Sequence, residues 1–223
     1  MKTRWNTEKS YGVLILIFLS LTNCGPLKEA IGMCANGEMM EATDGRPTVL
    51  VVGDSISIGY TPTIAAGLPN YQVVHNPCNA STTAWTKSQI GYWLNQRPTF
   101  EAITFNNGLW DISAWAHVSD ENYRDYLTEI AQRVKTKTAN PLFVLTTEVL
   151  PGTEGRIDAD VVTKNNIARA VMALEGIPVL DLYSVSQTIQ AEHVDATDVH
   201  FTALGSQILG TAILTALNTM GVN

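Results

Sequence analysis

Five short apolar runs, separated by longer amphipathic stretches, constrain the fold of this 223-residue chain most strongly. Each run is rich in β-branched or aromatic residues and is bounded by turn-forming residues, a pattern typical of strands that are buried on both faces. The runs cover residues 48–52, 71–74, 102–105, 142–146 and 178–182.

The stretches between the runs have helical periodicity. In residues 121–135, Tyr123 and Leu127 recur on one face, and residues 161–174 and 203–217 show similar spacing. Alternation of strands and helices predicts a parallel sheet with right-handed crossovers. We therefore expect a three-layer α/β/α sandwich around a five-stranded parallel sheet.

The composition is that of a globular protein, and we assign residues 47–223 to a single domain. Hydrophobic residues make up 45% of the chain and charged residues 16%, which argues against a disordered chain. The net charge of −7 and the lack of a Lys/Arg-rich stripe argue against a nucleic-acid partner. The sequence contains no cluster with metal-ligand spacing and no Gly-rich phosphate loop, so we expect no metal and no other cofactor.

The N-terminal residues are typical of an export signal. Basic residues precede an apolar stretch over residues 12–21 that is too short to span a bilayer comfortably, and the sequence around Cys24 resembles a bacterial lipobox. We interpret residues 1–23 as a signal peptide and residues 24–46 as a tether. We expect an exported periplasmic or cell-surface lipoprotein that contacts the membrane only through its N-terminus. A retained anchor helix and ordinary secretion are the alternatives.

Two further cysteines, Cys34 and Cys78, form an even pair if Cys24 carries lipid. In an oxidising compartment a disulfide bond between them is one interpretation, and two buried thiols are the other. Their positions in the sequence do not establish that they lie close enough to be bridged.

The first chemical signal is Gly53-Asp54-Ser55, which directly follows an apolar run. In an open α/β sheet, ligands bind beyond the carboxyl ends of the strands, where Ser55 would lie. A hydroxyl on a tight turn near a helix N-terminus is suited to nucleophilic attack, because that end of a helix favours developing negative charge. Asp and Ser are also favoured as helix N-caps, so a purely structural role is the alternative.

The second signal is Asp198 with His200, just before a helix that we expect Thr202 to cap. A general base needs access to the nucleophile and a carboxylate that fixes its tautomer and stabilises the imidazolium. A lone His is more often structural, and the other three histidines lack a comparable context. The pairing of this segment with Ser55 favours catalysis, since the predicted sheet brings both ends of the domain to one edge.

In order and spacing these segments resemble the SGNH hydrolase superfamily, also called GDSL-like lipases and esterases. Gly53-Asp54-Ser55 matches the first sequence block of the family, and Val199-His200-Phe201-Thr202 matches the last, so the resemblance covers roughly residues 47–220. It implies a flavodoxin-like fold and an esterase with Ser55 as nucleophile and His200 as general base.

The two middle blocks depart from the family pattern. The second block usually supplies a Gly whose backbone N–H binds the oxyanion, but residues 76–83 contain no Gly. The third block is usually Gly-x-Asn-Asp, and here Trp110 stands at the Asn position. Asn79 and Asn106 are the amides available as oxyanion donors. A turn residue that closes the strand is the other interpretation of Asn106.

The last block departs as well. The family places Asp three residues before the His, and Thr197, which occupies that position, cannot supply the charge that stabilises an imidazolium. A branch of the family that resembles this chain has Asp-Val-His-Phe-Thr, which implies that Asp198 is the acid. Asp195 is the reserve candidate.

We therefore expect hydrolysis of acyl esters, preferably acetyl esters of carbohydrates, through an acyl-enzyme. A lipid-directed esterase, lysophospholipase or thioesterase is an alternative that predicts an apolar acyl pocket. A non-catalytic carbohydrate-binding lipoprotein on the same fold is a further alternative. Aromatic rings near the expected site suit stacking on sugar faces, with core packing as the other interpretation, favoured for Trp93. These residues are Tyr60, Trp85, Trp93, Trp110 and Trp115.

Overall fold

The computed structural model describes residues 45–77 and 79–223. The predicted signal peptide and almost all of the predicted tether lie outside the described residues, so the interpretation of both stays a prediction. The same holds for lipid on Cys24 and for a disulfide between Cys34 and Cys78.

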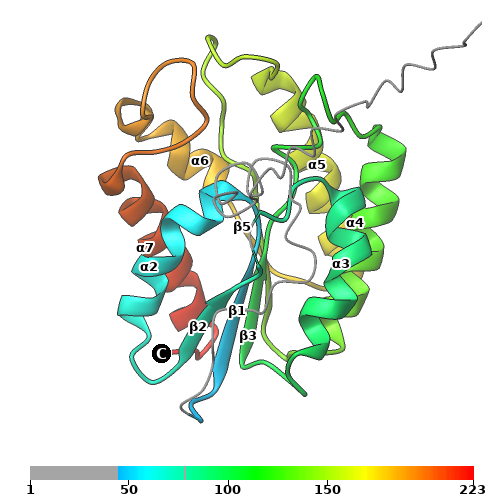
Figure 1. Ribbon diagram of the computed structural model, residues 1–223, viewed down its shortest axis with the longest axis vertical. Coiled ribbons are helices and arrows are strands. Elements are labelled where there is room, and N and C mark those ends of the chain that lie inside the picture. Colours follow the sequence, from blue (N-terminus) through cyan, green and yellow to red (C-terminus); the bar gives the residue numbers. More distant parts are fainter. Residues whose placement is uncertain (1–44, 78) are drawn as a thin grey trace, which may run out of the picture.

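Five parallel strands form one sheet in the order β2-β1-β3-β4-β5 (Figure 1). This is the strand order of flavodoxin-like doubly wound folds, in which ligands bind where the chain reverses direction across the sheet, between β1 and β3. The predicted fold class is confirmed. The strands are β1 (Thr48–Val52), β2 (Gln72–His75), β3 (Ala102–Phe105), β4 (Pro141–Val144) and β5 (Val179–Leu180).

Two strands end two residues earlier than the apolar runs predict, because a side chain binds the backbone after β4 and a helix begins directly after β5. Beyond β4, the N–H and C=O of Thr146 bond to the Asn165 side chain at 3.0 and 2.9 Å. Beyond β5, the Asp181 carboxylate accepts the Ser184 N–H at 3.0 Å and so starts a helix. Periodicity alone does not reveal either contact.

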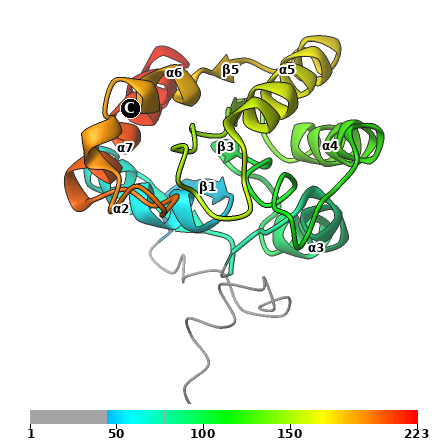
Figure 2. The same ribbon diagram turned by 90° about the horizontal axis from the view of Figure 1, so that it is seen from above.

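Helices cover both faces of the sheet, which gives the predicted three layers (Figures 1 and 2). The helices α4, α5 and α7 correspond to the three amphipathic stretches identified in the sequence. One face carries α2 (Ser55–Gly67), α6 (Leu182–Gln187) and α7 (Ala203–Thr219), and the other carries α3 (Thr83–Asn95), α4 (Asp120–Lys135) and α5 (Asp158–Glu175). A short 3-10 helix, Gln190–Glu192, precedes the last helix.

The central strand β1 separates two hydrophobic clusters. Val49 and Val51 belong to the cluster under α2 and α7, whereas Leu50 and Val52 belong to the cluster under α3 and α4. All four side chains are fully buried, as expected for a strand covered on both faces. Trp93 is also fully buried, which confirms the expectation that it is a core residue.

Candidate active site

The turn between β1 and α2 positions Ser55 at the carboxyl edge of the sheet. Only Gly fits at position 53, because a Cβ there would lie 2.6 Å from Ser57 Oγ. Asp54 is the N-cap of α2, and its carboxylate accepts the Ile56 N–H at 3.0 Å. Ser55 follows as the first residue of the helix and is only half-buried. Asp54 therefore caps the helix, and the Ser55 hydroxyl is available for other contacts.

The loop that carries His200 is held at its base. His193 and Phe201 form an antiparallel bridge, and their ring centroids lie 4.3 Å apart. The Val194 N–H donates to the His200 carbonyl at 2.9 Å. The Thr202 side chain then caps α7, as the sequence predicts. These contacts fix the backbone on both sides of His200.

Ser55, His200 and Asp198 form one hydrogen-bonded chain. His200 Nε2 lies 2.8 Å from Ser55 Oγ, and His200 Nδ1 lies 2.6 Å from Asp198 Oδ1. The same carboxylate oxygen accepts the backbone N–H of His200 at 2.9 Å. Because a carboxylate only accepts, the neutral imidazole carries its proton on Nδ1, which leaves Nε2 to accept from the Ser55 hydroxyl.

The Asp198 carboxylate is charged at neutral pH. Burial raises its pKa, but the hydrogen bonds from the His200 backbone and ring outweigh burial and hold the pKa below its ordinary value. The side chains of His200 and Asp198 are 46% and 38% exposed, so solvent screens their attraction. The geometry thus orients the imidazole firmly, while the pair itself contributes little to stability.

Asp195, the reserve candidate for the acid, bonds elsewhere. Its Oδ1 accepts both the N–H and the hydroxyl of Thr197, each at 2.7 Å. Thr197 stands where the family has its Asp, yet its hydroxyl bonds to Asp195 rather than to His200. The two residues together order the turn that precedes Asp198.

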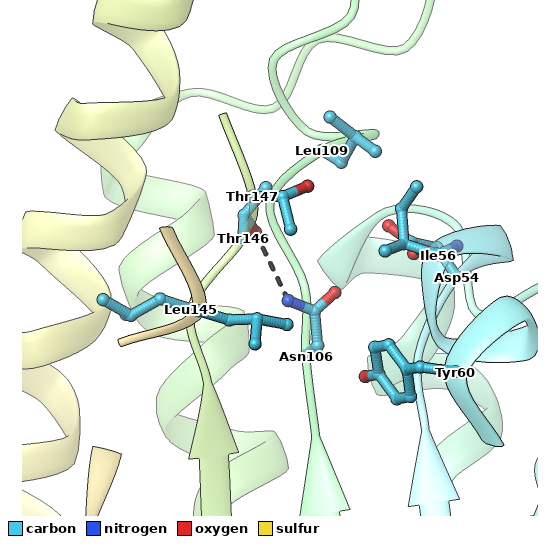
Figure 3. Close-up of a pocket in the computed structure, with 9 residues that line it drawn as sticks. Asp54, Ile56, Tyr60, Asn106, Leu109, Leu145, Thr146 and Thr147 are labelled. Carbon is cyan, nitrogen blue, oxygen red and sulfur yellow. Dashed lines mark hydrogen bonds between the residues drawn. The ribbon is translucent and has the colours of Figure 1, made fainter. Parts of the chain in front are cut away.

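Asn106 extends from the end of β3, but its amide is already engaged. Nδ2 donates to the Val144 carbonyl at 2.8 Å and lies 3.5 Å from Thr146 Oγ1. The side chain lines a small cavity of about 10 Å³, together with Asp54 and Tyr60 (Figure 3). That space accepts about one water molecule. An oxyanion role for Asn106 stays a prediction, and it would require the amide to leave Val144.

The Asn79 side chain is engaged through its oxygen. Its Oδ1 accepts the Ser81 N–H at 2.7 Å, whereas its Nδ2 makes no hydrogen bond in the part of the chain that the structure describes. Ser81 has φ 54°, a left-handed conformation that favours Gly. The second block therefore keeps a glycine-like backbone turn although it contains no Gly.

His75 and Ser57 form a buried hydrogen-bonded pair next to the turn that carries Ser55, and the sequence did not predict this pair. His75 Nε2 lies 2.6 Å from Ser57 Oγ, and its Nδ1 lies 2.7 Å from the Asn76 carbonyl. Asn76 Oδ1 in turn accepts the Gly53 N–H at 2.8 Å. These bonds tie the end of β2 to the turn that carries Ser55. His75 could have been identified by its position, because it directly follows the second apolar run and therefore lies at the carboxyl end of a strand.

The Asp of the third block has a structural contact. Asp111 Oδ1 accepts the N–H of Thr83 at 2.9 Å and its hydroxyl at 2.5 Å. Burial raises the pKa of the Asp111 carboxyl to about 6, against the opposing effect of these bonds. The contact ties the loop after β3 to the start of α3 and so fixes the position of the neighbouring Trp110.

A cavity of about 290 Å³ lies beside Ser55 and His200. Two of the five aromatic residues singled out in the sequence, Trp110 and Trp115, line it, and so does Arg156. Of the other aromatic residues, Trp85 is half-buried on α3 and lines no part of this cavity. The remaining walls are Leu109, Glu154, Asp195, Thr197, Asp198 and Val199.

Within residues 45–77 and 79–223, no group of three or more His, Cys, Asp or Glu side chains is arranged to hold a metal ion. In the same part of the chain, no helix has the length and apolar character needed to cross a membrane.

Solved structures share this arrangement of strands and helices. A lipase/acylhydrolase from Enterococcus faecalis superposes with a TM-score of 0.65 at 18% identity, over 78% of this chain and 96% of the other. A member of the lipolytic G-D-S-L family from Veillonella parvula gives 0.65 at 18% identity, over 77% and 98%. The chain has the SGNH hydrolase fold. A carbohydrate acetylesterase from Sinorhizobium meliloti gives 0.66 at 14% identity, over 78% and 100%.

No model of a known protein family matches the sequence, and no curated protein matches it. In this chain the turn between β1 and α2 and the loop before α7 meet, and they bring Ser55 and His200 within hydrogen-bond distance.

Proposed function

We propose that this protein is a serine ester hydrolase that removes small acyl groups, preferably acetyl, from saccharides. The hydrogen-bonded chain from Ser55 through His200 to Asp198 carries the proposal. An imidazole oriented by a carboxylate, with its second nitrogen on a serine hydroxyl, is the arrangement that activates serine for acyl transfer.

In the proposed first half-reaction, His200 Nε2 takes the hydroxyl proton as Ser55 Oγ attacks the ester carbonyl. The imidazolium that forms is stabilised by the charged Asp198. When the tetrahedral intermediate collapses, the bond to the leaving alcohol breaks and His200 returns the proton to that oxygen. Water then attacks the acyl-enzyme by the same steps, with His200 as its base, and releases the acid and free Ser55.

The tetrahedral intermediate requires donors to its oxyanion. Ser55 is the first residue of α2, so its backbone N–H is not used within the helix and lies at the positive end of the helix dipole. Asn79 Nδ2, which makes no hydrogen bond to any described residue, is the side-chain donor that we propose. Asn106 is the second candidate.

The walls of the cavity support a saccharide rather than a lipid. Trp110 and Trp115 provide flat faces of the kind on which sugar rings stack. Arg156, Glu154 and Asp195 line the same space, and such charged groups are unfavourable neighbours for a long acyl chain. Proteins with a similar fold include a carbohydrate acetylesterase and an acetyl xylan esterase.

We also propose that the protein is exported and carries lipid on Cys24. This proposal rests on the basic and apolar N-terminal sequence and on the lipobox-like residues that follow. Mass spectrometry of the chain purified from a bacterial membrane fraction tests it. An unmodified Cys24 would contradict it.

A fluorophosphonate probe tests the catalytic proposal. The purified chain should become labelled, and Ser55→Ala and His200→Ala should each abolish labelling. Ser88→Ala, which removes an exposed hydroxyl on α3, is the matched control and should be labelled like the wild type. A wild-type chain that stays unlabelled would refute the proposal and favour a non-catalytic carbohydrate-binding role. A panel of acetyl and long-chain esters then separates the saccharide esterase from the lipid-directed alternative.

A further inference from the structure

Arg156 lies at the junction of two cavities. One is the cavity of about 290 Å³ that also contains Ser55 and His200. The other, of about 420 Å³, is lined by the neighbours of Arg156 in the loop before α5, by residues that follow Asp111, and by the exposed Asp160 on α5. A ligand that extends from the reacting ester into the second cavity therefore passes the guanidinium.

Contacts from the loop after β3 fix this side chain. Arg156 Nε donates to the Leu109 carbonyl at 2.9 Å, and the guanidinium carbon lies 4.8 Å from the centroid of the Trp115 ring. Gly155, with φ +64°, permits this packing, because a Cβ there would lie 2.2 Å from Trp115 Cζ3. The Gly155 carbonyl also accepts the Ala114 N–H at 2.9 Å. The guanidinium is thus held before any ligand binds, which lowers the entropy cost of binding.

The terminal amino groups of Arg156 have no ion-pair partner in the part of the chain that the structure describes. Three carboxylates line the cavity beside Ser55. Asp198 accepts from His200, and Asp195 accepts from Thr197. Glu154, the third, is exposed. Burial lowers the pKa of the guanidinium while the Asp54 and Asp198 carboxylates raise it, and an arginine side chain stays charged in proteins.

We propose that Arg156 forms a subsite for a carboxylate on the sugar part of the substrate, so that the preferred substrates are acyl esters of acidic saccharides such as uronic acids. The inference rests on the proposed esterase function and names its substrate class. A fixed guanidinium with two unused amino groups matches a carboxylate in a bidentate pair. Because the same guanidinium stacks on Trp115, a sugar ring on that indole would bring its carboxylate within reach.

The test compares two substrates that differ only in the carboxylate: acetylated methyl glucuronoside and acetylated methyl glucoside. The wild type should have the higher kcat/KM for the glucuronoside, mainly through a lower KM. Arg156→Gln should reduce the ratio of the two kcat/KM values by about 10- to 100-fold, the range expected for hydrogen bonds to a charged group. Arg156→Lys should have a ratio between those of the wild type and Arg156→Gln, because lysine keeps the positive charge but cannot form the bidentate pair. Arg124→Gln, an exposed arginine on α4 that pairs with Asp125, should leave the ratio unchanged.

Equal kcat/KM for the two esters in the wild type, or an equal loss on both in Arg156→Gln, would overturn the subsite. If the neutral ester is still hydrolysed in that case, the esterase proposal stands. A failure of the subsite can therefore be distinguished from a failure of the esterase proposal. If neither ester is hydrolysed, calorimetry with the unacetylated glycosides decides. Binding of methyl glucuronoside that Arg156→Gln removes supports the subsite, and no binding to the wild type overturns it. Circular dichroism of each variant verifies that it is folded.

Discussion

Acidification should destabilise this protein through the buried His75. The ring is 3% exposed, and burial lowers its pKa from 6.5 to about 4, although the bond to the Asn76 carbonyl opposes this effect. Between pH 6.5 and about 4 the unfolded chain therefore binds a proton that the folded chain excludes. Stability is fully present above pH 6.5 and is lost as the pH falls toward 4, by about 3 kcal/mol for this single group.

The assay is guanidinium denaturation at a series of pH values from 4 to 7.5, followed by tryptophan fluorescence, for the wild type and His75→Gln. Gln keeps a polar group near Ser57 and does not titrate. The free energy of unfolding of the wild type minus that of the variant should rise by about 3 kcal/mol between pH 4 and pH 6.5. Groups common to both proteins cancel in this difference. A difference that is flat with pH, or that falls as pH rises, would refute the reasoning.

Asp111→Asn should show the opposite pH trend, because burial raises the pKa of the Asp111 carboxyl from 3.8 to about 6. As the pH rises from 3.8 to about 6, the free energy of unfolding of the wild type should fall by about 3 kcal/mol relative to that of the variant. The same denaturation series measures this difference. In steady-state assays, Asp198→Asn should lower kcat by about 10³- to 10⁴-fold, whereas Asp195→Asn should lower it by less than about tenfold. If Asp195→Asn had the larger effect, Asp195 and not Asp198 would be the acid that supports His200. Trp93→Ala should reduce the free energy of unfolding by about 3–5 kcal/mol because the indole is fully buried, and a loss below about 1 kcal/mol would contradict the packing.

The sequence predicted most of the fold because its information there is local. The β1 strand could be identified from consecutive apolar residues, and α4 and α7 from spacing along a few turns. Ser55 and His200 could be selected as candidate site residues because each lies in a short motif, and the capping role of Thr202 follows from the residue type at a helix start.

Contacts between distant segments could not be predicted in this way. The amide of Asn106 bonds to Val144, 38 residues away, and the sequence offered no means of knowing that this donor is engaged. His75 lacks a motif, and its role beneath the Ser55 turn arises only because β2 and β1 are neighbours in the sheet.

By itself, then, the sequence determined the alternation of strands and helices and the two motifs at the ends of the domain. Only the tertiary structure decided that Asp198 rather than Asp195 contacts the His200 ring, and that Arg156 stacks on Trp115 in the cavity beside Ser55. The physical reason is that periodicity and capping depend on neighbours within a few residues. Hydrogen bonds of 2.6–2.8 Å between side chains, in contrast, depend on how separate loops pack at one edge of the sheet.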